Sequence, residues 1–163
     1  MTVVSNTGPV IALAKVDTLP LLEQLFGVVL VPPTVHRELL AKPGPEARRL
    51  DQAFATFVQV MECPTATVTV EAAIAHLDHG EKEAVTLASL RDALLLIDDR
   101  LGRRAARHLG IRLTGTAGVL IQAVEQRLIP DAVAILEQMR ADGYWLSDDV
   151  LIAVRRATEQ REP

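Results

Sequence analysis

Residues 93–110 read ALLLIDDRLGRRAARHLG and place charge directly beside an apolar segment. Five apolar residues are followed by Asp98 and Asp99, and then by four arginines within eight positions. An apolar run without polar alternation is typical of a strand buried on both faces, as in a parallel sheet. The two aspartates come at the carboxyl end of this strand, which is where open α/β sheets bind their ligands.

The rest of the chain repeats this order of apolar strand and helix. The sequence predicts strands at residues 2–5, 27–31, 58–62, 93–97 and 111–113. It predicts helices at residues 9–16, 18–26, 34–42, 45–57, 70–91 with a break near Gly80, 99–109, 116–128, 131–141 and 147–158. Thr34 and Ser147 are expected N-caps, and Asp78 or His79 is expected to cap the helix after the break. The alternation predicts an α/β fold with a parallel sheet and right-handed crossovers.

Composition limits the class of protein. The 163 residues suit one domain, 49% are apolar, and the net charge is −4, so neither disorder nor a globally basic nucleic-acid binder is indicated. Cys63 is the only cysteine, which excludes an internal disulfide and a zinc–thiolate cluster. No apolar run approaches the roughly 18 residues of a membrane helix, and no basic residue precedes the first apolar segment, so we expect a cytoplasmic protein.

Two adjacent aspartates need more than one explanation. Either Asp98 or Asp99 suits an N-cap position, because an aspartate there accepts backbone N–H groups and complements the helix dipole. A cap uses only one of them, and two neighbouring carboxylates repel each other unless a cation lies between them. The pair therefore indicates a functional site as well as a cap.

Other polar groups follow the remaining strands. Asn6 ends the first strand within a good turn sequence, and Glu38 follows the second strand at the edge of an apolar helix stripe. Glu81 and Glu83 lie in the first turn of a later helix, where each borders the apolar stripe, and periodicity does not choose between them. Hard oxygen ligands converging at one sheet edge suit Mg²⁺ or Mn²⁺.

Five segments of the chain resemble the PIN-domain-like proteins, and nearest among them a prokaryotic subgroup related to VapC-type toxins of toxin–antitoxin pairs. These segments are VVSNTGPVIALAKV, VPPTVHREL, HGEKEAVTLA, LLLIDDRLGRRAARHLGIRLTGTAGVLIQAVEQRLIP and YWLSDDVL. The resemblance implies a three-layer α/β/α sandwich with a central parallel sheet of four to five strands. It covers nearly the whole chain, which we therefore interpret as one domain, 1–163, with C-terminal helices at about 130–158 packed on it or at a subunit contact.

The resemblance also implies a site. Asn6, Glu38, Glu83 and Asp99 match the metal-binding positions of the family, with Asp98 beside Asp99 and Glu81 as the alternative to Glu83. Glu38, Glu83, Asp98 and Asp99 are then the expected catalytic carboxylates. Asn6 departs from the family, whose active nucleases usually carry aspartate there. A unit charge pair at about 4 Å is worth roughly 4 kcal/mol at an effective dielectric of about 20, so this change weakens metal affinity.

A basic strip follows the paired aspartates. Arg100, Arg103, Arg104 and Arg107 fall at i, i+3, i+4 and i+7 of the predicted helix and form one stripe that suits phosphates or, equally, a solvated face. Thr114 or Thr116 is expected to cap the next helix, whose N-terminus offers N–H groups to an anion. The few aromatic residues show no base-stacking platform, and we expect Tyr144 and Trp145 to pack the tail helices or a subunit contact.

Together these features favour a metal-dependent endoribonuclease that hydrolyses RNA phosphodiesters with Mg²⁺ or Mn²⁺. The family resemblance implies a 5′-phosphate product, an antitoxin protein that blocks the cleft, and a homodimer. The alternative is a PIN-like module that binds nucleic acid or a partner without catalysis, because Asn6 replaces the usual aspartate.

Overall fold

A five-stranded sheet of parallel strands forms the centre of the protein in a computed structural model, which describes residues 1–41 and 44–160. The strand order is β3-β2-β1-β4-β5, so β1 lies in the middle of the sheet. The strands are β1 (Val3–Ser5), β2 (Val29–Val31), β3 (Val58–Val60), β4 (Leu94–Leu96) and β5 (Leu113–Thr114). The predicted α/β class and the parallel sheet are confirmed.

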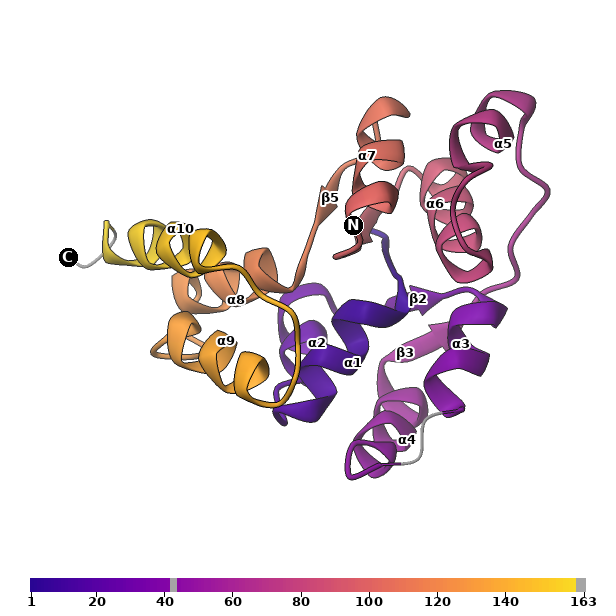
Figure 1. Cartoon of the computed structure of the whole chain (residues 1–163). Helices are drawn as coiled ribbons and strands as arrows, with labels where there is room; N and C mark the ends of the chain where they lie inside the picture. Colours follow the sequence, from indigo (N-terminus) through magenta and orange to yellow (C-terminus); the bar gives the residue numbers. More distant parts are fainter. Residues whose placement is uncertain (42–43, 161–163) are drawn as a thin grey trace.

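Helices cover both faces of the sheet, as Figure 1 shows. They are α1 (Thr7–Lys15), α2 (Leu21–Phe26), α3 (Pro33–Leu40), α4 (Ala47–Thr56), α5 (Val68–Ile74), α6 (His79–Arg91), α7 (Arg100–His108), α8 (Thr116–Glu125), α9 (Ala132–Ala141) and α10 (Asp148–Glu159). Residue 42 of the helix expected at 34–42 and residues 161–163 of the predicted domain lie outside the described residues.

Side chains of alternating strand positions divide the core into two clusters. Val3 of β1 packs with buried residues of α1 to α4 and α8 to α10, whereas Val4 packs with buried residues of α5, α6 and α7. Successive strand residues point to opposite faces, so a fully apolar strand is buried on both sides. The unbroken apolar runs of the sequence are therefore a direct consequence of the three layers.

The carboxyl ends of β1 and β4 are held side by side. Val4 pairs with Leu95, and one step further the backbone N–H of Asn6 donates to the carbonyl of Leu96 at 2.9 Å. The segments that leave these strands, beginning at Asn6 and at Asp98, therefore start at the same edge of the sheet. The same edge receives the helix N-termini that follow the strands.

The C-terminal helices α9 and α10 pack against α8 and against each other. Leu136 and Met139 of α9 and Leu151 and Val154 of α10 are buried in the cluster that includes α1 and α8. No helix among the described ranges is both long and apolar enough to cross a lipid bilayer.

Of the N-caps expected at Thr34, at Ser147 and at Asp78 or His79, two are observed. Asp78 and Ser147 accept backbone N–H groups as predicted, and Asp78 closes a capping box with Glu81. The prediction for Thr34 is wrong, because α3 begins one residue earlier, at Pro33, and is preceded by Pro32 in extended conformation. A proline at the first helical position lacks only an N–H that the helix does not use.

Candidate active site

The acidic cluster of the site begins with Glu38 on α3. The hydroxyl of Thr7, the first residue of α1, donates to Oε2 of Glu38. On its other side the Glu38 carboxylate lies against Gly80, where an added Cβ atom would come within 2.6 Å of Oε1. The absence of a side chain at position 80 therefore allows the Glu38 carboxylate to lie close to the N-terminus of α6; with a Cβ atom there this flexible side chain would have to shift.

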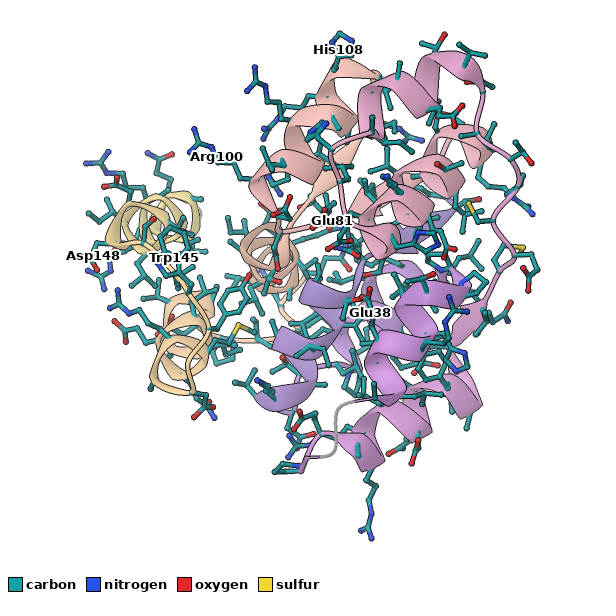
Figure 2. All side chains as sticks on the ribbon, turned by 45° about the vertical axis from the view of Figure 1, so that its right-hand side comes forward. Glu38, Glu81, Arg100, His108, Trp145 and Asp148 are labelled. Carbon is teal, nitrogen blue, oxygen red and sulfur yellow. The ribbon has the colours of Figure 1, made fainter. Side chains whose placement is uncertain are left out.

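Glu81 comes next to Glu38 from the first turn of α6, and Figure 2 shows both carboxylates in the middle of the molecule. Burial, and to a lesser extent the charges of Asp99, Asp78 and Glu38, raise the pKa of Glu81 to about 7. A hydrogen bond from the backbone of Asp78, at 3.3 Å, acts in the opposite direction. Carboxylates from α3, α6 and the end of β4 therefore share one region of negative potential.

Asp99 contributes the third carboxylate and is also the N-cap of α7. Its Oδ2 accepts a 2.7 Å hydrogen bond from the backbone N–H of Gly102, which fixes the side chain at the start of the helix. The other oxygen has no hydrogen bond from any described residue. One aspartate of the pair is thus the helix cap that the sequence predicts, with one oxygen left for another ligand.

Asp98 forms a different set of hydrogen bonds from Asp99. Its Oδ1 accepts the backbone N–H of Thr116 at 2.7 Å, and its Oδ2 accepts the hydroxyls of Thr116 and Tyr144 at 2.6 Å each. Gly115 permits this contact, because a Cβ atom there would come within 2.6 Å of Oδ1. Asp98 therefore connects β4, the start of α8 and the C-terminal segment through three hydrogen bonds.

The expectation that a threonine side chain caps α8 is wrong. The N-cap is Gly115, and no side chain of a capping residue bonds the first turn. Thr116 is the first residue of α8, and both its N–H and its hydroxyl donate to Asp98. The Asp98 carboxylate, which follows β4, therefore accepts the N–H that a capping side chain would otherwise accept. Thr114, the other threonine expected as a cap, lies half-buried in β5.

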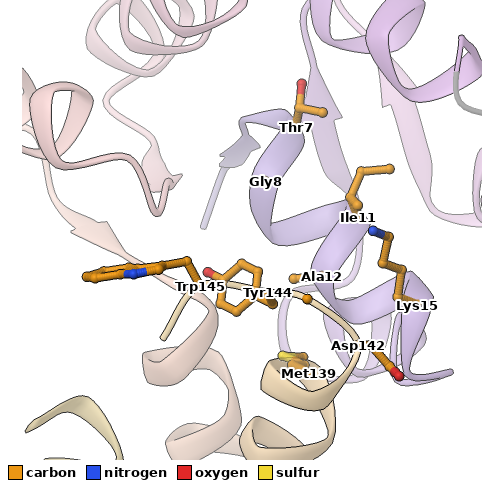
Figure 3. Close-up of a pocket in the computed structure, with 10 residues that line it drawn as sticks. Thr7, Gly8, Ile11, Ala12, Lys15, Met139, Asp142, Tyr144 and Trp145 are labelled. Atoms are coloured by element: carbon orange, nitrogen blue, oxygen red, sulfur yellow. The ribbon is translucent and has the colours of Figure 1, made fainter. Parts of the chain in front are cut away.

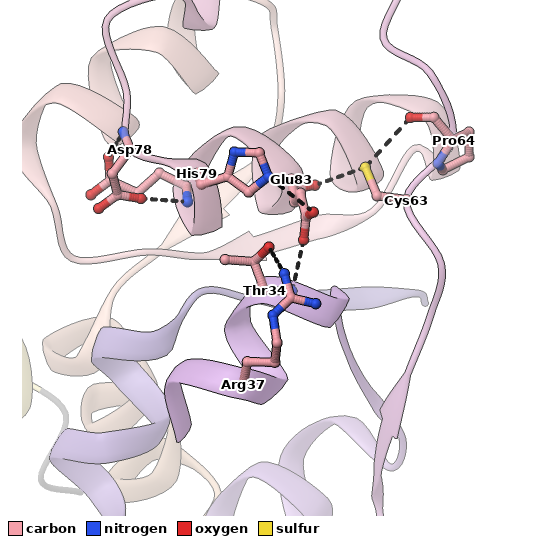
Figure 4. Close-up of polar contacts among 8 residues, drawn as sticks. Thr34, Arg37, Cys63, Pro64, Asp78, His79 and Glu83 are labelled. Carbon is pink, nitrogen blue, oxygen red and sulfur yellow. Dashed lines mark hydrogen bonds and ion pairs between the residues drawn. The ribbon is translucent and has the colours of Figure 1, made fainter. Parts of the chain in front are cut away.

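The Glu83 carboxylate contacts the start of α3, as Figure 4 shows. Its Oε2 accepts the backbone N–H of Thr34 at 2.9 Å, in the first turn of α3, and its Oε1 lies 3.8 Å from Nε2 of His79. The structure therefore brings Glu81, the alternative of the sequence analysis, to Glu38 and Asp99. Glu83 instead supplies the α3 N-terminus with an acceptor that Thr34 does not provide.

Asn6 lies between the ends of β1 and β4. It is 8% exposed, and its extended backbone continues the alternation of β1, so its side chain points to the same face of the sheet as Val4, toward α6 and α7. No described residue forms a hydrogen bond with its side-chain amide. A nearly buried, unbonded amide at the carboxyl end of β1 is available to a ligand.

The arginine stripe of α7 divides into two parts. Arg100, Arg104 and Arg107 are exposed and form no ion pair with any residue in the described ranges. Arg103 is half-buried, donates to the carbonyl of Ile97 at 2.8 Å and lies beside Asp98. Burial lowers the pKa of Arg103, with the neighbouring Arg107 adding to the effect. The stripe therefore offers three free guanidinium groups.

The donors at the acidic edge match a divalent metal ion in kind. Carboxylate and amide oxygens are hard ligands, which Mg²⁺ and Mn²⁺ prefer. Over residues 1–41 and 44–160, no three His, Cys, Asp or Glu side chains already surround one point as a metal shell. A cation between Glu38, Glu81 and Asp99 would offset the repulsion between their charges.

Sequence reasoning missed three residues of this region. Thr7 and Gly80 position Glu38, and Tyr144 positions Asp98. Gly80 carried a local signal, since a glycine in the first turn of a helix suggests a close approach. Thr7 and Tyr144 carried none, because their partners lie 31 and 46 positions away.

A parallel α/β sandwich with carboxylates at the carboxyl ends of its strands is the architecture of a nuclease-like class of protein, among others. Within that class, the chain belongs to the PIN-domain family, because a family model described as a PIN domain matches residues 2–160. No curated protein matches the chain. PIN domains are generally nucleases that act on nucleic acid and typically use divalent metal ions. The relation to VapC-type toxins stays a prediction.

Proposed function

We propose that the protein is a metal-dependent endoribonuclease whose metal ligands are Glu38, Glu81, Asp99 and Asn6. The interaction of three carboxylates from three separate elements, Glu38 on α3, Glu81 on α6 and Asp99 after β4, carries this proposal. Structural stability alone does not explain such a cluster, because uncompensated like charges destabilise the folded state. Membership of a family of nucleases supports the same conclusion.

Glu38, Glu81, Asp99 and Asn6 would hold a divalent ion, which when bound would supply an activated water and offset charge on the scissile phosphate. The chain's own residues orient the ligands: Thr7 holds Glu38, and the Gly102 N–H holds Asp99 with one oxygen facing outward. Glu81, with a pKa near neutrality, exchanges its proton under ordinary assay conditions. Asn6 adds a neutral oxygen where an aspartate would add charge, so we expect weaker metal binding than in relatives with aspartate.

The exposed arginines of α7 bind the substrate. Arg100, Arg104 and Arg107 follow Asp99 directly and have no acidic partner among the described residues. One guanidinium group can donate two hydrogen bonds to the oxygens of a phosphate. Each such contact also releases counterions from the nucleic acid. A polyanion held along α7 passes the N-terminus of that helix, where Asp99 is located. This placement supports an RNA strand as the substrate.

The test is cleavage of a labelled single-stranded RNA in Mn²⁺ and in Mg²⁺ by the wild type and two variants. Asp99→Asn keeps the helix cap, because asparagine caps as well as aspartate, but removes a ligand charge. We expect it to abolish cleavage without changing the midpoint of urea unfolding. Asn6→Asp restores the charge and is expected to increase cleavage. Unchanged cleavage by Asp99→Asn would refute the proposal.

A PIN-like module that binds nucleic acid without cleaving it is the second candidate. Asn6 and the lack of a preformed three-ligand shell among residues 1–41 and 44–160 favour it. Calorimetric titration with Mn²⁺ separates the two, since the module does not bind the ion at millimolar concentration. The toxin role, the antitoxin and the homodimer are further proposals that rest on the resemblance to VapC-type proteins. Light scattering at several protein concentrations tests the dimer.

A further inference from the structure

Trp145 stands out on the surface because its side chain is 85% exposed. It follows Tyr144 in the connection between α9 and α10. Sequence reasoning expects both aromatic residues to pack the tail helices or a subunit contact. Tyr144 is half-buried, but Trp145 packs little of its indole against the chain. Large exposed aromatic rings are uncommon in water and commonly belong to binding surfaces.

Two cavities meet at this connection. The first, of about 210 Å³, lies between α1 and residues 142–145 and extends from Trp145 to Thr7 and Gly8; Figure 3 shows its lining. Thr7, at one end of this cavity, also donates a hydroxyl hydrogen bond to Glu38 of the acidic cluster. The second, of about 350 Å³, is lined by Asp98, Arg103 and Trp145 on the other side.

The aromatic connection is fixed relative to the acidic cluster. The Tyr144 hydroxyl donates to Asp98 at 2.6 Å, and the Tyr144 N–H donates to the carbonyl of Met139 at 3.0 Å. Asp98 is the neighbour of Asp99 in the chain. A platform held in this way loses little conformational freedom when a flat ligand binds to it.

We propose that Trp145 stacks on an unpaired base of the substrate strand, next to the nucleotide that is cleaved. This inference rests on the proposed function and adds a base-binding subsite to it. The occupant follows from position: Thr7, at one end of the first cavity, also donates to Glu38, and Tyr144, next to Trp145, donates to Asp98, the neighbour of Asp99. Lys15 and Asp142 line the first cavity, and Arg103 and Asp98 line the second. Base–aromatic stacking tolerates any base, so the subsite selects single strands and not a sequence.

The chain offers a direct probe, since Trp145 is its only tryptophan. Single-stranded RNA is titrated into the protein in EDTA, so that no cleavage occurs, and indole emission is followed. Stacking is expected to quench the indole emission of Trp145 progressively until the binding site is saturated with RNA. A strand of the same length with abasic nucleotides, and a blunt duplex, are expected to bind through phosphates without this quenching. Equal quenching by the abasic strand would overturn the proposal.

Variants measure the affinity by anisotropy of the labelled strand in EDTA. Trp145→Ala is expected to raise the Kd for the RNA strand by about 5- to 100-fold, whereas Trp145→Phe is expected to raise it by a smaller factor. Val68→Ala is the matched control, because Val68 is 84% exposed on α5, and no change is expected. An unchanged Kd for Trp145→Ala, or indole emission that changes with protein concentration alone, would overturn the proposal. Binding without cleavage in metal would instead refute only the nuclease.

Discussion

The hydroxyl of Tyr144 donates a 2.6 Å hydrogen bond to Oδ2 of Asp98, which lies 46 positions earlier in the chain. This bond connects the segment between α9 and α10 to the strand end from which Asp99 also projects. Thr116 completes the junction from α8. The C-terminal helices therefore contribute to the geometry of the acidic edge although they carry none of its proposed ligands.

Tyr144 is expected to stay protonated well above pH 10. Burial and the charge of Asp98 both raise its pKa. A raised pKa in the folded state contributes stability that is fully present below the unfolded value of about 10 and is lost at higher pH. Tyr144 is the only tyrosine, so tyrosinate absorbance reports it directly. Titration of the native protein at the same pH as the urea-unfolded protein would contradict the observed hydrogen bond.

Removing the hydroxyl tests the same junction by stability. Tyr144→Phe deletes a hydrogen bond to a carboxylate and is expected to lower the free energy of unfolding by about 1.5–3 kcal/mol. Trp145→Phe, at the exposed neighbouring position, is the control and is expected to unfold like the wild type. Urea unfolding followed by circular dichroism measures both. Equal midpoints for Tyr144→Phe and the wild type would show that the Tyr144 hydrogen bond adds no stability and that the hydrogen bonds from Thr116 alone hold Asp98.

The pKa of Glu81 predicts a pH dependence of opposite sign with and without metal. In EDTA the pKa of Glu81 is higher in the folded than in the unfolded protein, so its protonated carboxyl contributes to the free energy of unfolding. This contribution is fully present below about pH 4.3 and is lost as the pH rises through about 7. With Mg²⁺ the ion binds the ionised carboxylate, so metal-induced stabilisation increases over the same window. Urea midpoints from pH 5 to 8 measure both effects.

Glu81→Gln is the control for this pH dependence, since glutamine still completes the capping box with Asp78. The difference between the variant and the wild type isolates the carboxyl group. We expect the variant to lose the dependence between pH 5 and 7 in EDTA and most of the stabilisation by Mg²⁺. A variant with the same pH profile as the wild type would place the titrating group elsewhere.

Local sequence patterns were sufficient to predict the class of fold. Unbroken apolar runs such as residues 93–97 predict buried parallel strands, and the helices between them predict the crossovers. The strands are shorter than these runs: the apolar run 27–31 becomes β2, Val29–Val31. Strand order does not follow from such patterns, because it depends on which crossovers pass over which neighbours. That β1 lies between β2 and β4 is known only from the structure.

The candidate site was predictable in part. Position after a strand identified Asn6, Glu38 and Asp99, since parallel strands end at one edge. Periodicity could not separate Glu81 from Glu83, because both lie in the first turn of α6. A tertiary partner, the Thr34 N–H, decides where Glu83 points. Such contacts are set by packing of α3 on α6, which no local pattern records.

Gly80→Ala is expected to reduce cleavage while leaving the fold intact. A Cβ atom at position 80 would come within 2.6 Å of Glu38 Oε1, so the flexible carboxylate must move away from the cluster. Misplacement by about 1 Å costs about 10- to 100-fold in rate. Helix propensity favours alanine by up to about 1 kcal/mol, so stability should not fall. Cleavage by Gly80→Ala equal to that of the wild type would show that the activity does not depend on the close approach of Glu38 to position 80.

The salt dependence of RNA binding tests the exposed arginines. Replacing Arg104 or Arg107 by glutamine removes one phosphate contact each, so the slope of log K against log salt should decrease by about 0.7 per variant. Arg112→Gln is the control, because Arg112 donates to the carbonyl of Asp92 before β4 and lies at the opposite edge of the sheet. An unchanged slope in the α7 variants would remove this helix from the RNA-binding surface.

Glu83→Gln and Glu81→Gln are expected to have contrasting effects, although the two residues are separated by a single position. The Glu83 carboxylate accepts the Thr34 N–H at 2.9 Å and complements the α3 N-terminus, so Glu83→Gln should cost about 1 kcal/mol of stability. Cleavage per folded molecule should be nearly unchanged. Glu81→Gln removes a proposed metal ligand and should abolish cleavage with little loss of stability in EDTA. Parallel cleavage and urea-unfolding measurements on both variants decide the matter. The reverse pattern would place Glu83 among the ligands, and the α3 N-terminus would then need another acceptor.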